Sequence, residues 1–467
     1  MSDVLVLVGP GLAADEALLG EIAEREFAAL GVRGVITHVR DAADVRARTR
    51  TRRGTSPEPD PVAALAGPPG QGSGPALPGT SGQESEPART VTADAGEGLH
   101  VSAPAAEGGG LERRGARARA TVIIPGPEED IRRLMGESLG LVVWLDIWRA
   151  DGIVVGEGAA HVHGRGLGGL AWAIRHAVHR LRHPYQRISY GPHHEQRADL
   201  YLPAEAREVP GEGAGAAVAP LPVGAVRMPV VVLVHGGYWR SVWAADLMDA
   251  LCADLVERGF AVWNLEYRRP DLHGWEAATA DVAAGLDALA SAGAPLDLGR
   301  VAVVGHSAGG QLALRAAADG ARVVLAVSLA GVLDLVEGDR RWLSSGAVAA
   351  ALGTAATHMP DIAGGAPRAA TLPGRGWWAG DGHEAARSVY DAASPMLRLP
   401  LGVRQLIVQG SGDDLDLLDF GRRYAKAAHD AGDNVKYLEM VGDHFAVITP
   451  DTPIWRATAQ SITDALR

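Results

Sequence analysis

Short apolar runs alternate with segments of helical pattern in the first part of the chain. The runs predicted as strands are residues 4–8, 34–39, 120–124, 141–146 and 152–156, and the predicted helices are 15–30, 128–137 and 167–181. Strands and helices that alternate in this way are typical of a parallel sheet with helices on both faces. The pattern predicts a small α/β domain with a parallel sheet, made of residues 1–45 and 119–183.

The stretch between these two pieces has a different composition. Residues 46–118 are rich in proline, glycine and charged side chains and show no periodic apolar pattern. Such a segment cannot bury enough apolar surface to offset the entropy lost on ordering. We therefore expect a disordered insertion within the first domain.

A strand–turn–helix pattern surrounds Ser307. The apolar run 301–304 leads into Gly-His-Ser-Ala-Gly, and a helical pattern follows over 311–318. Gly305 and Gly309 leave room for a sharp turn between strand and helix. That turn presents the serine hydroxyl at the start of the helix, so the pattern predicts a nucleophilic serine.

A nucleophilic serine needs a base, and the base needs an acid to orient it. The strand-like run 405–410 is followed by Asp413, and the run 435–440 is followed by His444. An acid at the end of one strand and a histidine after the next is the layout that a Ser-Asp-His order requires. Asp414 and Asp416 remain alternatives for the acid.

A third apolar run, residues 229–234, ends in His-Gly-Gly-Tyr-Trp. Glycines at such a strand end let backbone N–H groups face the oxyanion of a tetrahedral intermediate. The expected donors are the N–H groups of Gly237, Tyr238 and Ala308.

Together these motifs resemble the α/β-hydrolase superfamily, and within it the kynurenine formamidases (arylformamidases) and small carboxylesterases. The resemblance covers about residues 186–467 and implies an α/β-hydrolase fold. It also implies a reaction that needs no cofactor or metal. It implies Ser307 as nucleophile, His444 as base and Asp413 as orienting acid. The further positions that carry it are His235, Gly236, Trp239, Gly305, His306 and Gly309. The histidine that the family has at the end of the acid strand is replaced here by Gln409.

Residues 331–400 lack clean strand alternation and are expected to form a cap over the nucleophile. The aromatic side chains of this stretch are Trp342, Trp377, Trp378 and Tyr390. Aromatic rings offer a large contact area to flat apolar groups. The cap therefore predicts a medium-sized, partly aromatic molecule as substrate, which we expect to be a small-molecule ester or formamide.

The first domain resembles, more weakly, type II 3-dehydroquinate dehydratase, and this resemblance implies a flavodoxin-like fold for residues 1–45 and 119–183. Its Val-Leu-Val-Leu-Val-Gly-Pro-Gly start and its Val-Ile-Ile-Pro-Gly middle carry the likeness. The Asn before Pro-Gly is missing, since Ile124 meets Pro125 directly, and the family's catalytic Arg, Tyr and His have no counterpart. A domain without that activity is the first reading. A bifunctional dehydratase and a hydrolase-fold binding protein without activity are the alternatives.

Composition narrows the classes of partner. A net charge of −12 argues against general nucleic-acid binding, and no apolar run reaches membrane-spanning length. Cys252 is the only cysteine, which agrees with a reducing, cytoplasmic setting. Self-association is left open.

Two histidine groups have spacings that permit zinc ligation, although neither has an evident carboxylate or thiol to complete the ligand set. They are His161 with His163, and His176 with His179 and His183.

Overall fold

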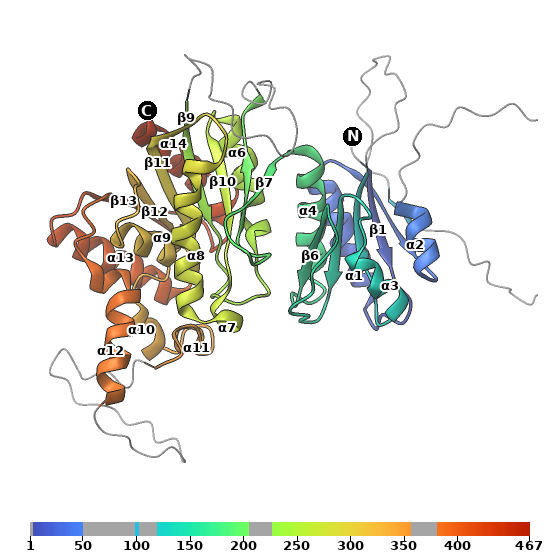
Figure 1. Cartoon of the computed structure of the whole chain (residues 1–467), viewed down its shortest axis with the longest axis horizontal. Helices are drawn as coiled ribbons and strands as arrows, with labels where there is room; N and C mark the ends of the chain where they lie inside the picture. Colours follow the sequence, from blue (N-terminus) through green and yellow to red (C-terminus); the bar gives the residue numbers. More distant parts are fainter. Residues whose placement is uncertain (1–2, 50–98, 102–118, 205–226, 356–380) are drawn as a thin grey trace, which may run out of the picture.

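The computed structural model describes residues 3–49, 99–101, 119–204, 227–355 and 381–467. Two α/β bodies lie side by side, and helix α4 of the first body is on the side that faces the second (Figure 1). Each body is built on its own sheet, six-stranded in the first and eight-stranded in the second.

The first sheet has the order β3-β2-β1-β4-β5-β6. Its strands are β1 (Asp3–Val8), β2 (Arg33–His38), β3 (Leu99–Val101), β4 (Arg119–Ile124), β5 (Val142–Asp146) and β6 (Ala159–His163). All pairs are parallel except β2 with β3. The helices are α1 (Glu16–Ala29), α2 (Ala42–Thr49), α3 (Glu129–Arg133), a 3-10 turn at Leu134–Gly136 and α4 (Gly169–Arg182).

Strand β1 is buried on both faces, as its continuous apolar run predicts. Val4, Val6 and Val8 pack with α1 and α4 on one face. Leu5 and Leu7 pack with α2 and α3 on the other. The prediction of a parallel sheet covered on both sides is confirmed.

Two details of the sequence prediction for this domain are wrong. Residues 152–156 form no strand, and the fifth strand of the α/β pattern is β6. The run is apolar because Ile153 and Val155 pack against the second core of the domain, while the Gly156 N–H donates to the Met135 carbonyl at 2.7 Å. The predicted disorder over 46–118 also fails in two places, because α2 continues to Thr49, with Val45 fully buried, and because β3 (Leu99–Val101) pairs with β2. The rest of that stretch lies outside the described residues.

The second sheet has the order β14-β13-β12-β11-β9-β10-β8-β7. Its strands are β7 (Gln186–Ser189), β8 (Arg197–Tyr201), β9 (Met228–Val234), β10 (Ala261–Glu266), β11 (Leu296–His306), β12 (Leu325–Leu329), β13 (Arg404–Gly410) and β14 (Val435–Met440). The pairings of β8 with β7 and with β10 are antiparallel and the others are parallel. The carboxyl ends of β9, β11, β13 and β14 therefore meet at one edge.

Helices cover both faces of this sheet. One face carries α6 (Asp249–Glu257) and α14 (Pro453–Leu466), and the other carries α8 (Trp275–Asp287), α9 (Ala308–Ala318) and α13 (Leu415–Asp430). Alternate residues of β9 divide between the two cores, with Val230, Val232 and Val234 in one and Val231 and Leu233 in the other. Cys252 is a fully buried thiol in α6.

Between β12 and β13 the chain forms α10 (Leu335–Arg340), α11 (Ala347–Leu352) and α12 (Asp381–Ala393). Two of the four aromatic side chains predicted for the cap, Trp377 and Trp378, lie outside the described residues. Tyr390 is buried in the main hydrophobic core, so its expected place on a substrate wall is wrong. Trp342 is 67% exposed.

No helix in the described ranges is both long enough and apolar enough to cross a bilayer.

Candidate active site

The turn at Ser307 joins β11 to α9. Ser307 has φ 55° and ψ −120°, a conformation that costs energy in a non-glycine residue, and its N–H donates to the Leu329 carbonyl at 2.8 Å. A Cβ on Gly305 would lie 1.9 Å from the Gly309 carbonyl oxygen, and one on Gly309 would lie 2.1 Å from the Val234 carbonyl oxygen. The two glycines are thus required by close backbone approach.

Asp413 and His444 meet where β13 and β14 end. Nδ1 of His444 lies 3.0 Å from Oδ2 of Asp413, whose side chain is 2% exposed. Gln409 Nε2 donates to Oδ2 of Asp413 at 2.7 Å, and the Asp414 N–H donates to its Oδ1 at 2.7 Å. These two donors hold the Asp413 carboxylate in position against the His444 imidazole. Gln409 stands where the family that this sequence resembles has a histidine.

The alternative acids point elsewhere. Asp414 caps helix α13, where its carboxylate accepts from the Asp416 N–H at 2.8 Å. Asp416 accepts from the Arg341 guanidinium at 2.8 Å. Asp413 alone of these three has a hydrogen bond to the His444 ring within the described chain.

His444 is tied to the serine turn through His306. Nε2 of His306 donates to the His444 carbonyl at 3.0 Å, and the two rings lie 4.8 Å apart. Burial lowers the pKa of His306 to about 3, so this imidazole is neutral. Among the residues described, no hydrogen bond joins Ser307 directly to the His444 ring; catalytic pairs of this kind often close only when substrate binds.

The loop after β9 lies against the serine turn. A Cβ on Gly236 would be 2.6 Å from the His306 carbonyl oxygen and 2.9 Å from Cβ of Ser307. The next residues, Gly237, Tyr238 and Trp239, have φ values of 110°, 51° and 57°. This run of left-handed conformations turns the backbone next to the serine, where the N–H groups of Gly237, Tyr238 and Ala308 can face an oxyanion.

The buried side chain of His235 holds this loop in position through hydrogen bonds. Its Nδ1 lies 2.8 Å from the Gly236 carbonyl oxygen and its Nε2 lies 3.0 Å from Oε1 of Glu266, both as hydrogen bonds. Burial raises the pKa of Glu266, but the combined interactions with His235, Arg197 and the Ala245 N–H outweigh burial, so the pKa is lowered overall. Trp239 is buried and donates from its indole to Gln311 at 3.2 Å. His235 and Trp239 are structural supports of the loop, and Glu266 is a support that the sequence reasoning missed.

The first domain also contributes to the surroundings of the site. Trp172 of α4 lies 5.6 Å from Trp243 and 5.9 Å from Phe445, ring centroid to ring centroid. Arg165 donates to the Val242 carbonyl at 2.7 Å and forms a paired hydrogen bond with Asp246. Both side chains of that pair are at most 5% exposed. No local motif marks these residues, because their role depends on how the two domains pack.

The fold brings a carboxylate to each of the two predicted histidine groups, Asp146 to the first and Asp249, shared by His176 and His179, to the second. His161 bonds Asp146 at 3.0 Å, and His163 accepts from the Ala150 N–H at 3.2 Å. His176 bonds Asp249 at 2.6 Å. His179 bonds the Tyr201 hydroxyl at 3.2 Å and stacks on His183. These histidines hold the first domain together and attach it to the second.

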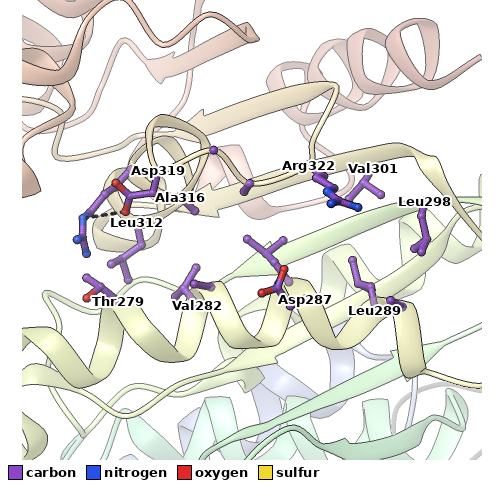
Figure 2. Close-up of a pocket in the computed structure, with 16 residues that line it drawn as sticks. Thr279, Val282, Asp287, Leu289, Leu298, Val301, Leu312, Ala316, Asp319 and Arg322 are labelled. Carbon is purple, nitrogen blue, oxygen red and sulfur yellow. Dashed lines mark ion pairs between the residues drawn. The ribbon is translucent and has the colours of Figure 1, made fainter.

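A groove of about 490 Å³, lined by both apolar and charged side chains, lies between α8 and α9 (Figure 2). Val282, Leu289 and Leu312 line it, and Leu298 and Val301 place it near the amino end of β11. Ser307 follows the carboxyl end of the same strand, so the groove is not part of the candidate site.

The second domain has sequence similarity to known proteins. Residues 221–339 match the family model described as BD-FAE. The hydrolase LUC6 of Fusarium sp. is 36% identical over 154 residues, which are 30% of this chain and 31% of that protein. The chain thus spans about a third of the length of that relative.

Solved esterases superpose on the chain at low identity. Esterase B from Lactobacillus rhamnosis has a TM-score of 0.46 at 16% identity over 62% of this chain and 91% of its own. Carboxyl esterase 2 from Tuber melanosporum has a TM-score of 0.44 at 16% identity over 61% of this chain and 87% of its own. The strand order, the turn at Ser307 and the matching family model together identify the second domain of this chain as an α/β-hydrolase fold.

Proposed function

We propose that the chain is a serine hydrolase that cleaves a carboxylic ester or an aryl formamide through an acyl-enzyme intermediate. The observation that carries the proposal is the strained backbone of Ser307, next to a hydrogen-bonded His444–Asp413 pair. A strained non-glycine turn persists only where surrounding contacts enforce it, and such turns gather at active sites.

In the proposed reaction Ser307 Oγ attacks the substrate carbonyl while Nε2 of His444 takes the hydroxyl proton. Asp413 accepts the hydrogen bond from Nδ1 of His444 and so keeps Nε2 free to act as the base. His444 then gives the proton to the departing alcohol or amine. Water attacks the acyl-enzyme by the same route and releases the acid. These steps need no cofactor or metal.

The negative charge of the tetrahedral intermediate would be stabilised by the N–H groups of Gly237, Tyr238 and Ala308. Removing one donor of this kind typically costs about 3–4 kcal/mol of transition-state stabilisation. The close contact of Gly236 with the serine turn supports this assignment, because it holds the loop beside the nucleophile.

The substrate class follows from the aromatic side chains that surround the site. Phe445 follows the base directly, and its ring lies 5.6 Å from that of His444. Trp243 packs against Gly237. We propose a small-molecule ester or formamide with an aryl group as the substrate, with the reaction taking place in the cytoplasm.

Labelling with a fluorophosphonate probe tests the nucleophile. The wild-type chain is expected to react with the probe and Ser307→Ala is expected not to, with both proteins giving the same circular dichroism spectrum. A fully labelled S307A variant, or an unlabelled wild-type chain, would contradict the proposal; the second result favours a binding protein without activity.

Turnover of N-formyl-kynurenine and of short aryl esters, measured side by side, then separates formamidase from esterase activity. A higher kcat/KM for the formamide favours the arylformamidase branch.

A further inference from the structure

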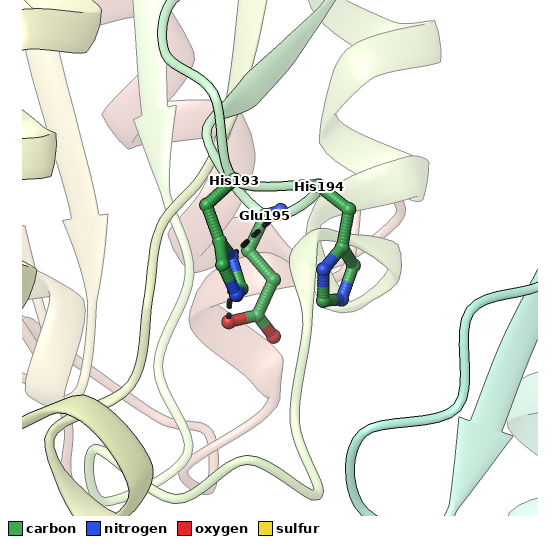
Figure 3. Close-up of side chains that lie close together, drawn as sticks. All are labelled: His193, His194 and Glu195. Atoms are coloured by element: carbon green, nitrogen blue, oxygen red, sulfur yellow. Dashed lines mark hydrogen bonds and ion pairs between the residues drawn. The ribbon is translucent and has the colours of Figure 1, made fainter.

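Two histidines and a glutamate of one loop lie close together beside the junction of β7 and β8, and a third histidine contacts the glutamate. His193, His194 and Glu195 lie in the connecting loop, and their potential ligand atoms are all within 4.8 Å of one another (Figure 3). His273, at the end of α7 (Pro270–His273), brings its Nε2 to 3.3 Å from Oε2 of Glu195. None of these residues belongs to the proposed triad or oxyanion loop.

The carboxylate of Glu195 has one oxygen with a strong partner and one without. Glu195 is 7% exposed, and its Oε1 accepts a hydrogen bond from the Arg269 guanidinium. Its Oε2 is buried and has no hydrogen-bond donor. A buried oxygen left in this way costs free energy, and an unseen ion is one of the established reasons for it.

The unbonded oxygen faces the imidazoles. Nδ1 of His193 lies 3.8 Å from it and accepts a hydrogen bond from the Glu195 N–H at 3.3 Å, which leaves Nε2 as the ligand atom of that ring. The ring of His193 is 4.8 Å from that of His273 and 4.4 Å from that of His194. The unbonded oxygen and the three rings therefore lie within a few ångströms of one another at the junction of the loop with α7.

We propose that Glu195 Oε2 and the imidazoles of His193, His194 and His273 bind a Zn²⁺ ion. Nitrogen-rich sets with one carboxylate suit Zn²⁺, whereas Ca²⁺ and Mg²⁺ prefer oxygen ligands. Arg269 holds the far oxygen of Glu195 and so orients the ligand, as partners outside a metal's ligand set commonly do.

The ion would join the β7–β8 loop to α7, and this link bears on both domains. Asp271 of α7 accepts hydrogen bonds from the Ser241 N–H at 3.0 Å and from Arg149 of the first domain at 2.7 Å. His194 and Glu195 also line a cavity of about 700 Å³ whose other walls include Arg165 and Ala159 of the first domain. The proposed site is a structural clamp at the domain junction.

Isothermal titration calorimetry tests the site. The full chain is first treated with EDTA and dialysed, and zinc chloride is then titrated into it. We expect one Zn²⁺ per chain and a higher melting temperature with zinc, because a ligand that binds only the folded state stabilises it. His194→Ala is the main variant, since His194 is exposed and its loss leaves the core intact. It should weaken zinc binding at least tenfold, and Glu195→Gln should do the same.

His429→Ala removes an exposed histidine of α13, far along the chain, and is the matched control. It should bind zinc as the wild type does. The proposal is overturned if the wild-type chain binds no zinc, or if H194A and H429A bind it equally well. Zinc binding is measured without any ester substrate. The zinc-site proposal can therefore fail while the serine-hydrolase proposal stands, and the reverse.

Discussion

Trp172 of the first domain lies edge-on against Trp243 of the second, with ring centroids 5.6 Å apart and ring planes at 90°. Trp243 in turn fills the space beside Gly237, where an added Cβ would lie 2.3 Å from the Trp243 Cβ. One indole therefore separates the first domain from the proposed oxyanion loop. Arg165 reinforces the contact, with its guanidinium 4.4 Å from the Trp243 ring. Through these contacts the first domain packs against the loop that carries the proposed oxyanion donors.

Trp172→Ala should lower kcat/KM for an aryl ester by roughly tenfold or more, because small displacements of a catalytic loop can cost up to about a hundredfold in rate. Trp148→Ala is the control, since Trp148 belongs to the same domain and is 78% exposed. Steady-state kinetics of both variants, with melting curves, make the comparison. Equal activity of W172A and the wild type would show that the contact is without effect on the site.

Adjacent aspartates should respond differently to the same substitution. Asp413→Asn leaves the shape of the site intact but presents the wrong hydrogen-bond partner to His444, so kcat should fall by about 10⁴. Asp414→Asn keeps a capping side chain at the start of α13, and asparagine caps helices as well as aspartate does. Its activity and stability should stay close to wild type. Comparable losses of kcat in both variants would point to shared roles for the two carboxylates.

The site elements that the sequence predicted are those set by local chemistry. The turn at Ser307 follows from glycines that β11 and α9 require, and the α/β-hydrolase fold follows from the order of strand and helix patterns. The placement of Asp413 against His444 needs only that parallel strands end at the same edge. These relations are fixed by neighbours along the chain or by adjacent strands.

What the sequence did not predict depends on packing between distant segments. Residues 152–156 have the apolar composition of a strand, yet they pack beside the 3-10 turn, and periodicity alone cannot separate these outcomes. Trp172 and Arg165 act through the docking of α4, which no spacing within the chain reveals. The adjacent His193, His194 and Glu195 were a visible signal, but His273 joins them only through the fold.

Gly236→Ala should abolish turnover. The new Cβ would lie 2.6 Å from the His306 carbonyl oxygen and 2.9 Å from the Ser307 Cβ, so either the loop or the serine turn must move. Gly20→Ala in α1 is the matched control, because no atom lies within 4 Å of its added Cβ. That variant should gain up to about 1 kcal/mol of stability, since alanine favours a helix over glycine. Measurable turnover by G236A at the wild-type level would mean that the loop does not contact the nucleophile.

Acidification should destabilise the chain below about pH 6.5, the usual pKa of an unfolded histidine. Burial lowers the folded-state pKa of His163 to about 4 and of His306 to about 3. Between these values and 6.5 the unfolded chain binds protons that the folded chain does not, so stability is present above pH 6.5 and is lost as the pH falls.

The slope of the unfolding free energy against pH, measured by urea titrations from pH 7 to pH 5, checks this expectation. His163→Gln can still accept the hydrogen bond from the Ala150 N–H, so the variant should fold and show a shallower slope than the wild type. His429→Gln removes an exposed histidine and should leave the slope unchanged. A slope for His163→Gln equal to that of the wild type would mean that the burial of His163 does not contribute to the loss of stability in acid.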